Sequence, residues 1–172
     1  MNIFVFDKDI GKCAEYHNDK HVVKMCLESA QILCTVCHNL GMDVPWKPVH
    51  TNHPCTVWAM TSLGNWLWLR DYCFALNSEY LWRFDKGANH RAWDVVNKLQ
   101  VPDMRHKRKT EHVICMPDEY KKDTVIDSYR AYYVWGKASI AKWSLPAKIP
   151  AWYSSKKYPK EDLCLLNKTT NG

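Results

Sequence analysis

The feature that most constrains this chain is a run of residues at helical spacing between positions 19 and 39. At ~100° per residue, its apolar side chains cover an arc of about 220° and its polar ones an arc of about 100°. A helix that is apolar over so much of its girth packs against neighbours on several sides, so we expect it to be central. Asn18 or Asp19 can cap its start, and Gly41 follows its end.

The polar side chains of this run form one narrow stripe, made of Lys20, His21, Lys24, Glu28, Gln31, Thr35 and His38. Lys24 and Glu28 are four residues apart, so one interpretation is a surface ion pair that contributes little to stability. The alternative is a cleft wall in which Glu28 is a general acid/base and the nearby cations hold an anionic substrate. The helical pattern alone leaves both interpretations open.

Apolar spacing predicts further helices over residues 9–16, 55–84 with a break near Gly64, 88–99 and 126–143. Residues 3–6, IFVF, indicate a short strand or an extended lead-in, and nothing else suggests strands or internal repeats. We therefore expect an all-α fold, with a compact single-domain helical bundle over residues 1–153. Residues 154–172 are predicted to form an extended, partly disordered C-terminal tail.

The formal net charge of +6 favours an anionic partner, DNA or a nucleotide. No apolar run approaches the ~18 residues of a membrane span, and MNIFVFDKD lacks the pattern of a signal peptide. We therefore expect no membrane partner, a cytoplasmic location and eight cysteines that are free thiols. P-loop, GxGxxG, GxSxG and HExxH motifs are absent, which disfavours the common nucleotide hydrolases, dehydrogenases, serine hydrolases and metalloproteases.

Two motifs resemble cofactor-binding sites, but we predict no bound cofactor at either of them. His17 and His21 are one helical turn apart, and His50 and His53 follow in HTNH, but four histidines at these spacings suit an anion site equally well. The string CTVCH at 34–38 matches a haem-attachment motif, yet both of its cysteines fall on the apolar arc of the central helix. The predicted site therefore contains neither a metal nor another cofactor.

Basic residues gather in two places outside the central helix. RHKRK at 105–109 lies in a predicted loop, where it is either a solvated surface run or a contact for phosphates. YRAYYVWGK at 129–137 interleaves basic and aromatic residues, as nucleic-acid surfaces often do. Its tyrosines could equally pack on the central helix.

Several motifs spread over about residues 1–153 resemble small proteins encoded by many bacteriophages: DKHVVKMCLESAQIL, HTNHPCTVWA, NWLWLRDY, MPDEYK and YRAYYVWGK. More distantly, the chain resembles the pyrimidine-dimer DNA glycosylase/AP lyase family of the phage endonuclease V type. The resemblance implies a compact all-α domain that flips a nucleotide and cuts DNA through a Schiff base, here in the cytoplasm of a host cell. Asp19, His21 and Glu28 stand at the family's spacings, which implies that Glu28 takes the role of the catalytic glutamate.

The resemblance extends to two other places, and the chain departs from the family in two. YYVWGKA is similar to the family's DNA-contacting end, and NHP at 52–54 is similar to a motif of bacterial relatives. The family's nucleophile is the α-amine of a small residue exposed when the initiator methionine is removed, but a methionine before Asn2 is normally retained. The candidate nucleophiles are therefore the α-amine of Met1 and the side chains of Lys20 and Lys24, which would need a lowered pKa. The arginines that flank the family's glutamate are also missing, since Leu27 precedes Glu28.

We predict from these observations a DNA-base glycosylase/AP-lyase-like enzyme that acts on damaged or modified pyrimidines in DNA. The predicted catalytic residues are Glu28, His21, Lys24, Lys20 and Met1. The predicted nucleic-acid or nucleotide contacts are His17, Asn52, His53, Arg105, Lys107, Arg108, Lys109, Tyr129, Arg130, Tyr133 and Lys137. Two alternatives are an enzyme acting on free nucleotides or nucleosides in the same cleft, and a non-catalytic phage protein that binds a host nucleotide signal or a host protein.

Overall fold

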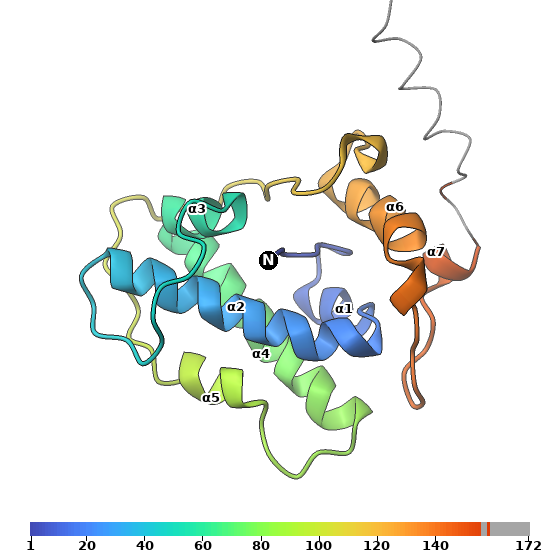
Figure 1. Cartoon of the computed structure of the whole chain (residues 1–172), viewed down its shortest axis with the longest axis horizontal. Helices are drawn as coiled ribbons and strands as arrows, with labels where there is room; N and C mark the ends of the chain where they lie inside the picture. The colour runs from blue at the N-terminus through green and yellow to red at the C-terminus, as the bar shows by residue number, and fades with distance from the viewer. Residues whose placement is uncertain (156–157, 159–172) are drawn as a thin grey trace, which may run out of the picture.

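The computed structural model describes residues 1–155 and 158, and within them every regular element is a helix. In chain order these are α1 (Ile10–Glu15), α2 (Asp19–Asn39), α3 (Pro54–Thr61), α4 (Leu63–Arg83), α5 (Arg91–Val96), η1 (Asp118–Tyr120), α6 (Val125–Gly136), η2 (Ala138–Ile140) and α7 (Ala151–Ser154). The prediction of an all-α fold is confirmed (Figure 1). No helix among the described residues combines the length and apolar composition that a bilayer span requires.

Helix α2 lies at the centre of the fold, as its apolar girth predicts, and packs against α3, α4 and α5 (Figure 1). Its start is set by Asn18, whose side-chain oxygen accepts a hydrogen bond of 2.9 Å from the backbone N–H of His21. Such a cap satisfies one of the backbone donors that the first turn of a helix leaves unpaired. The predicted central helix over 19–39 therefore has the bounds that the structure shows.

The solvent-facing side of α2 differs from the predicted polar stripe. Val23 and Leu27, which fall in the apolar arc, are 39% and 40% exposed. His21, Glu28 and Thr35, which fall in the polar stripe, are buried. Part of the predicted stripe therefore faces the interior, which is where buried polar groups need specific partners.

The other helices are confirmed with shifted ends. The predicted helix 55–84 breaks at Ser62, two residues before Gly64, because the extended Ser62 caps α4 by accepting from Asn65 N–H at 3.2 Å. Helix α6 ends at Gly136, short of the predicted residue 143. The segment after it is held elsewhere, since the carbonyl of Lys142 accepts from the N–H of Asp19 at 2.8 Å.

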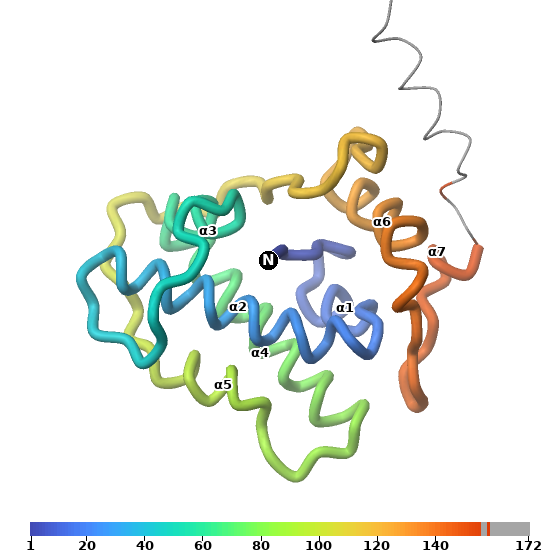
Figure 2. Tube along the Cα trace, viewed as in Figure 1, coloured from blue at the N-terminus to red at the C-terminus, as the bar shows by residue number. Residues whose placement is uncertain are grey.

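Residues 3–6 form an extended segment that is almost completely buried and pairs with no strand among the described residues. It runs through the middle of the fold between α2 and α6 (Figure 2). Helical side chains satisfy its backbone: Tyr72 Oη donates to Phe4 O at 3.2 Å, and Arg130 Nε donates to Phe6 O at 2.9 Å. The prediction of an N-terminal extended segment is confirmed.

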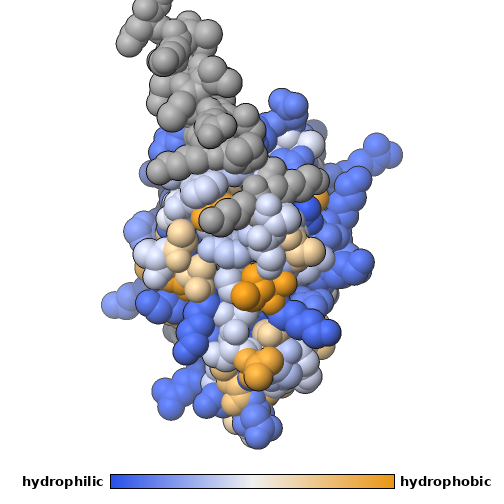
Figure 3. Space-filling view, turned by 90° about the vertical axis from the view of Figure 1, so that its right-hand side faces the viewer, coloured by the Kyte–Doolittle hydropathy of each residue, from blue (hydrophilic) through white to orange (hydrophobic). Residues whose placement is uncertain are grey.

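The C-terminal part of the prediction is only partly covered by the structure. Most of the predicted tail, residues 156–157 and 159–172, lies outside the described residues. Helix α7 runs across the predicted boundary at residue 153, and Tyr158 is buried with its hydroxyl donating to Asp127 Oδ1 at 2.7 Å. The face that carries α6 and α7 is mainly hydrophilic with separate apolar patches, where grey atoms do not cover it (Figure 3).

Arg83, at the end of α4, joins the start of α2 to the rest of the bundle. Its buried guanidinium donates to the carbonyls of Glu15 and His17 at 3.0 and 2.6 Å and pairs with Glu79 at 2.7 Å. It also lies 3.3 Å from Asp19, whose carboxylate accepts from Ser144 N–H and Oγ–H. Asp19, which the resemblance aligns with an acidic residue of the glycosylase/lyase family, therefore has a structural role here.

Replacing Arg83 should destabilise the fold strongly. Arg83→Met leaves two carboxylates and two carbonyls without their donor, and breaking a buried pair in this way costs about 3–5 kcal/mol. Arg83→Lys should recover little, because an ammonium cannot reproduce the planar fork. Urea unfolding monitored by circular dichroism measures the change. Arg70→Met, at a partly exposed position of the same helix, is the control and should stay within about 0.5 kcal/mol of wild type. A near-normal Arg83→Met would contradict this account.

Candidate functional site

A cavity of about 450 Å³ lies beside α2, where the N-terminal residues meet α6 and the segment before η1. It is lined by Met1, Asn2, Phe4, His21, Lys24, Met25, Glu28, Cys115, Met116, Pro117, Tyr132 and Lys137. Three of its charged groups are cationic, namely the α-ammonium of Met1, Lys24 and Lys137, and one is the carboxylate of Glu28. The excess of positive charge suits an anionic ligand.

The carboxylate of Glu28 contacts nitrogen groups of three other residues at this site. This carboxylate is buried, and Oε2 accepts a 2.8 Å hydrogen bond from the backbone N–H of Asn2. The other oxygen, Oε1, lies 3.9 Å from the α-amine of Met1 and 3.5 Å from Nζ of Lys24. The ion pair expected from the i, i+4 spacing is therefore present, and it lies in a cavity wall. The ion pair of the first interpretation and the cavity wall of the second are therefore both present, and the catalytic role of Glu28 stays a prediction.

Asn2 anchors the N-terminal residues at this site, and the sequence analysis missed it. Its side-chain Nδ2 donates to Cys115 O at 2.7 Å, while Oδ1 accepts from Tyr129 Oη at 3.0 Å and from Ile3 N at 2.8 Å. The backbone N–H, the side-chain Nδ2 and the side-chain Oδ1 of Asn2 are thus all bonded, which fixes the neighbouring α-amine against Glu28. The position of this asparagine next to a candidate nucleophile was the one sequence signal that could have indicated its anchoring role.

His21 lines the same cavity as a neutral group. Its ring lies 4.7 Å from Phe4 and 5.3 Å from Tyr133, and Nδ1 has no hydrogen-bond partner. Burial, followed by the charges of Lys137 and Lys24, lowers the pKa of His21 to about 3. It is therefore a neutral donor or acceptor at physiological pH, and it cannot hold a phosphate by charge.

Of the remaining predicted residues, three aromatic-ring residues are in the core, so their predicted contact with nucleic acid is wrong. His17 is fully buried, with Nδ1 on Cys13 O at 2.7 Å and Nε2 on Tyr72 Oη at 2.8 Å. Tyr129 and Tyr133 are also fully buried. A side chain that packs on all sides cannot stack on a base. The tyrosine of this segment that does line the cavity is Tyr132, one position before Tyr133.

Arg130 has a structural position as well. Its guanidinium bonds the carbonyl of Phe6, lies 3.5 Å from Asp7 and stacks over Trp152 at 5.3 Å. It thus joins the N-terminal segment to α6 and α7. Lys137, in contrast, lies at the cavity with Nζ 4.8 Å from the ring centre of Tyr132.

The predicted basic loop is exposed but does not line this cavity. The four residues of this loop that we predicted to contact nucleic acid are all exposed: Arg105, Lys107, Arg108 and Lys109. The loop lies at the start of α4, where a Cβ on Gly64 would come within 2.4 Å of the backbone of Lys109. Lys20 and Asn52 are exposed too and are not among the cavity residues. The structure therefore separates a cavity from a basic surface that the sequence analysis joined.

A second ligand-like cluster adjoins the cavity. The donor atoms of His53, Cys55 and Cys115 all lie within 4.8 Å of one another, and Nε2 of His53 is 3.7 Å from Sγ of Cys115. The cofactor prediction weighed the four histidines and the CTVCH motif and did not consider this set, because Cys115 is distant in sequence. The seven cysteines among the described residues are unpaired.

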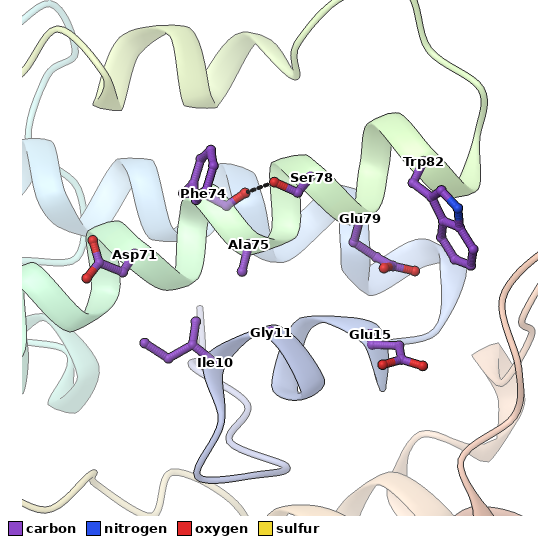
Figure 4. Close-up of a pocket in the computed structure, with 9 residues that line it drawn as sticks. All are labelled: Ile10, Gly11, Glu15, Asp71, Phe74, Ala75, Ser78, Glu79 and Trp82. Atoms are coloured by element: carbon purple, nitrogen blue, oxygen red, sulfur yellow. Dashed lines mark hydrogen bonds between the residues drawn. The ribbon is translucent and has the colours of Figure 1, made fainter.

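A larger hollow, of about 710 Å³, lies between α1 and α4 (Figure 4). Three carboxylates, Glu15, Asp71 and Glu79, stand around its apolar floor, and Phe74 and Trp82 are beside them (Figure 4). Carboxylates repel phosphates, so this hollow is a poor place for a nucleotide. We therefore take the smaller cavity at Glu28 as the candidate site.

Comparisons of this chain with protein-family models, with curated proteins and with solved structures found no match. The function therefore has to be argued from the site itself, and the resemblance to the glycosylase/lyase family stays a prediction.

The low pKa of His21 predicts a specific acid sensitivity. The folded state excludes a proton that the unfolded chain binds below its ordinary pKa of 6.5, so stability is lost as pH falls from 6.5 towards 3. His21→Phe keeps the ring contacts and removes this titration. Its unfolding free energy should fall less than that of wild type between pH 7 and pH 5 in urea titrations. His38→Gln, at the exposed end of α2, is the control, and an unchanged slope in His21→Phe would contradict the assignment.

Proposed function

We propose that this chain is a DNA glycosylase/AP lyase for damaged or modified pyrimidines, with the α-amine of Met1 as nucleophile and Glu28 as acid/base. One observation carries the proposal: the amine lies 3.9 Å from a buried carboxylate inside a cavity whose other charged groups are cationic. An amine beside a general base is the arrangement that imine chemistry needs. The resemblance of the α2 motif to the family points to the same glutamate.

The reaction that fits this pair proceeds through an imine. Glu28 first takes a proton from the α-ammonium of Met1. The neutral amine attacks C1′ of the target nucleotide, the N–C1′ bond forms, and the bond to the base breaks as the base leaves with its electron pair and takes that proton from Glu28. Glu28 takes the amine proton and returns it to the ring oxygen as the sugar opens to the iminium. The carboxylate then removes a proton from C2′, and the 3′ phosphate leaves by β-elimination. Water hydrolyses the remaining imine and frees the amine.

The other cavity residues suit a nucleotide drawn out of the stack. Lys24 and Lys137 add positive charge to the cavity that contains Glu28, where they can hold the phosphates that flank the sugar. Tyr132 presents a partly exposed ring at the wall, and such a ring can stack on a base. Neutral His21 also lines the cavity, with its unpaired Nδ1 buried away from solvent.

Met1 is a better candidate nucleophile than either lysine. Asn2 holds its amine in one position, whereas the side chain of Lys24 is 62% exposed and free to move although Nζ is 3.5 Å from Glu28. Lys20 does not line the cavity. Because a nucleophile has to stay aligned with the bond it attacks, the fixed amine is favoured.

Borohydride trapping tests the proposal. Wild type, incubated with duplexes that carry an abasic site or a pyrimidine dimer, should give a covalent adduct that mass spectrometry maps to Met1. Glu28→Gln should lower the cleavage rate by about 100-fold or more, because it removes the acid/base. A Gly-Ser extension before Met1 moves the amine and should abolish trapping, whereas Lys24→Arg, which removes only the lysine amine, should keep it.

Three outcomes would overturn all or part of this assignment. An adduct on Lys24 would replace the nucleophile and keep the chemistry. Full trapping by the extended chain would exclude the α-amine. An absence of adducts, with folded protein and a working lyase as positive control, would exclude imine chemistry altogether.

The salt dependence of binding separates DNA from a free nucleotide as the ligand. If the protein contacts several phosphates of a duplex, its affinity for the duplex should fall steeply as salt is added. The slope of log K against log salt concentration should be about −0.9 for each phosphate contact. Lys137→Gln should reduce that slope by about 1, whereas Lys107→Gln should change it less, because Lys107 is paired with Asp103 away from the cavity. Fluorescence anisotropy over a salt series gives both slopes. A shallow slope in wild type would favour a nucleotide.

A further inference from the structure

The cluster of His53, Cys55 and Cys115 joins two distant parts of the chain beside the cavity. His53 is the N-cap of α3, Cys55 lies in its first turn, and Cys115 lies in the segment before η1. The three donor atoms lie within 4.8 Å of one another. Cys55 also approaches Oδ1 of Asn2 at 3.7 Å, and Cys115 lines the cavity.

We propose that His53, Cys55 and Cys115 bind a zinc-like divalent cation. Zinc bonds thiolate sulfur at about 2.3 Å and imidazole nitrogen at about 2.0–2.1 Å, so a tetrahedral site separates N from S by roughly 3.6 Å. The separation of 3.7 Å between His53 Nε2 and Cys115 Sγ fits that edge. Two soft thiolates with one imidazole select zinc-class ions over Mg²⁺ or Ca²⁺.

The burial of the ligands leaves one side of the site open. Cys55 is fully buried, while His53 and Cys115 are partly exposed. Three protein ligands with an accessible fourth position are typical of metal sites that also bind water or a substrate group, rather than of closed structural sites. An ion can therefore enter from the cavity side, and the fourth position is available to an anionic ligand.

Two alternatives for these side chains are weaker. Cysteines often serve as small hydrophobes, but Cys115 is the partly exposed one of the seven described cysteines and faces a histidine. A second explanation is that His53 is only a helix cap, since Nδ1 accepts from Cys55 N–H at 3.2 Å. A neutral ring has one proton, so coordination through Nε2 moves that proton to Nδ1 and ends this hydrogen bond. The loss of one cap bond is small beside three metal–ligand bonds.

Another pair of cysteines provides an internal comparison. Cys26 and Cys73 have their sulfur atoms 3.7 Å apart at the crossing of α2 and α4, and both are fully buried. That pair is therefore less accessible to a metal ion from solvent than Cys115, which is partly exposed. Cys26→Ala is therefore a matched control, because it removes a close thiol without touching the proposed site.

Titration of the reduced, metal-free full chain with Co²⁺ tests the proposal. One equivalent should produce a thiolate-to-cobalt charge-transfer band and the visible bands of tetrahedral cobalt, and Zn²⁺ should then remove both. Cys115→Ser and His53→Asn, in which asparagine keeps the capping oxygen, should each weaken binding by at least about 100-fold, beyond the loss that an outer-shell change causes. Cys26→Ala should bind as wild type does. Circular dichroism establishes that each variant is folded.

The outcomes that would overturn the site are distinct. A wild-type chain without a charge-transfer band would exclude thiolate coordination. A band that survives in Cys115→Ser and disappears in Cys26→Ala would move the metal to the other pair. Because the readout is metal binding alone, it is independent of whether the chain cleaves DNA, and neither result decides the other.

Discussion

The burial of residues 3–6, together with the anchoring of Asn2 on α2, is the constraint on which the rest of the structure depends. An extended segment inside a helical bundle has no strand partner, so each of its backbone groups needs a side chain or a loop. Tyr72, Arg130 and Glu28 meet this need from three different helices. The helices are thereby held around the segment, and the α-amine of Met1 is brought to the carboxylate on the central helix.

The parts of the fold that depend on local pattern were predictable. The ends of α2 follow from its periodicity and its cap at Asn18, and the other helices were expected near the right positions. The end of α6 was not, because Asp19 draws residues 142–144 to the start of α2 through bonds across more than a hundred residues. The exposure of Val23 and Leu27 also depends on which neighbours cover the helix, and a helical wheel contains no such information.

The candidate site also combines features that local sequence predicts with features that depend on tertiary contacts. Lys24 and Glu28 share a helix turn, so their pairing was visible in the sequence, whereas Asn2, Cys115 and Tyr132 reach the cavity only through tertiary structure. The aromatic-basic segment could not show which of its faces turns inward. Tyr129 and Tyr133, four residues apart, are fully buried, whereas Tyr132, at the edge of the same face of α6, lines the cavity. The metal cluster was hidden for the same reason, since its third ligand lies sixty residues beyond the first two.

The buried lead-in also sets an order of events during synthesis. Phe6 leaves the ribosome early. The hydrogen bond from Arg130 to its carbonyl cannot form until Arg130, which is 124 residues further along the chain, has been synthesised. At ~5–20 residues per second, that interval is roughly 6–25 s. During this time a short, strongly apolar stretch has no native partner on α6, which makes the nascent chain a natural client for a chaperone that binds extended apolar segments. The same feature that positions the amine thus makes the final assembly of the site one of the last steps of folding.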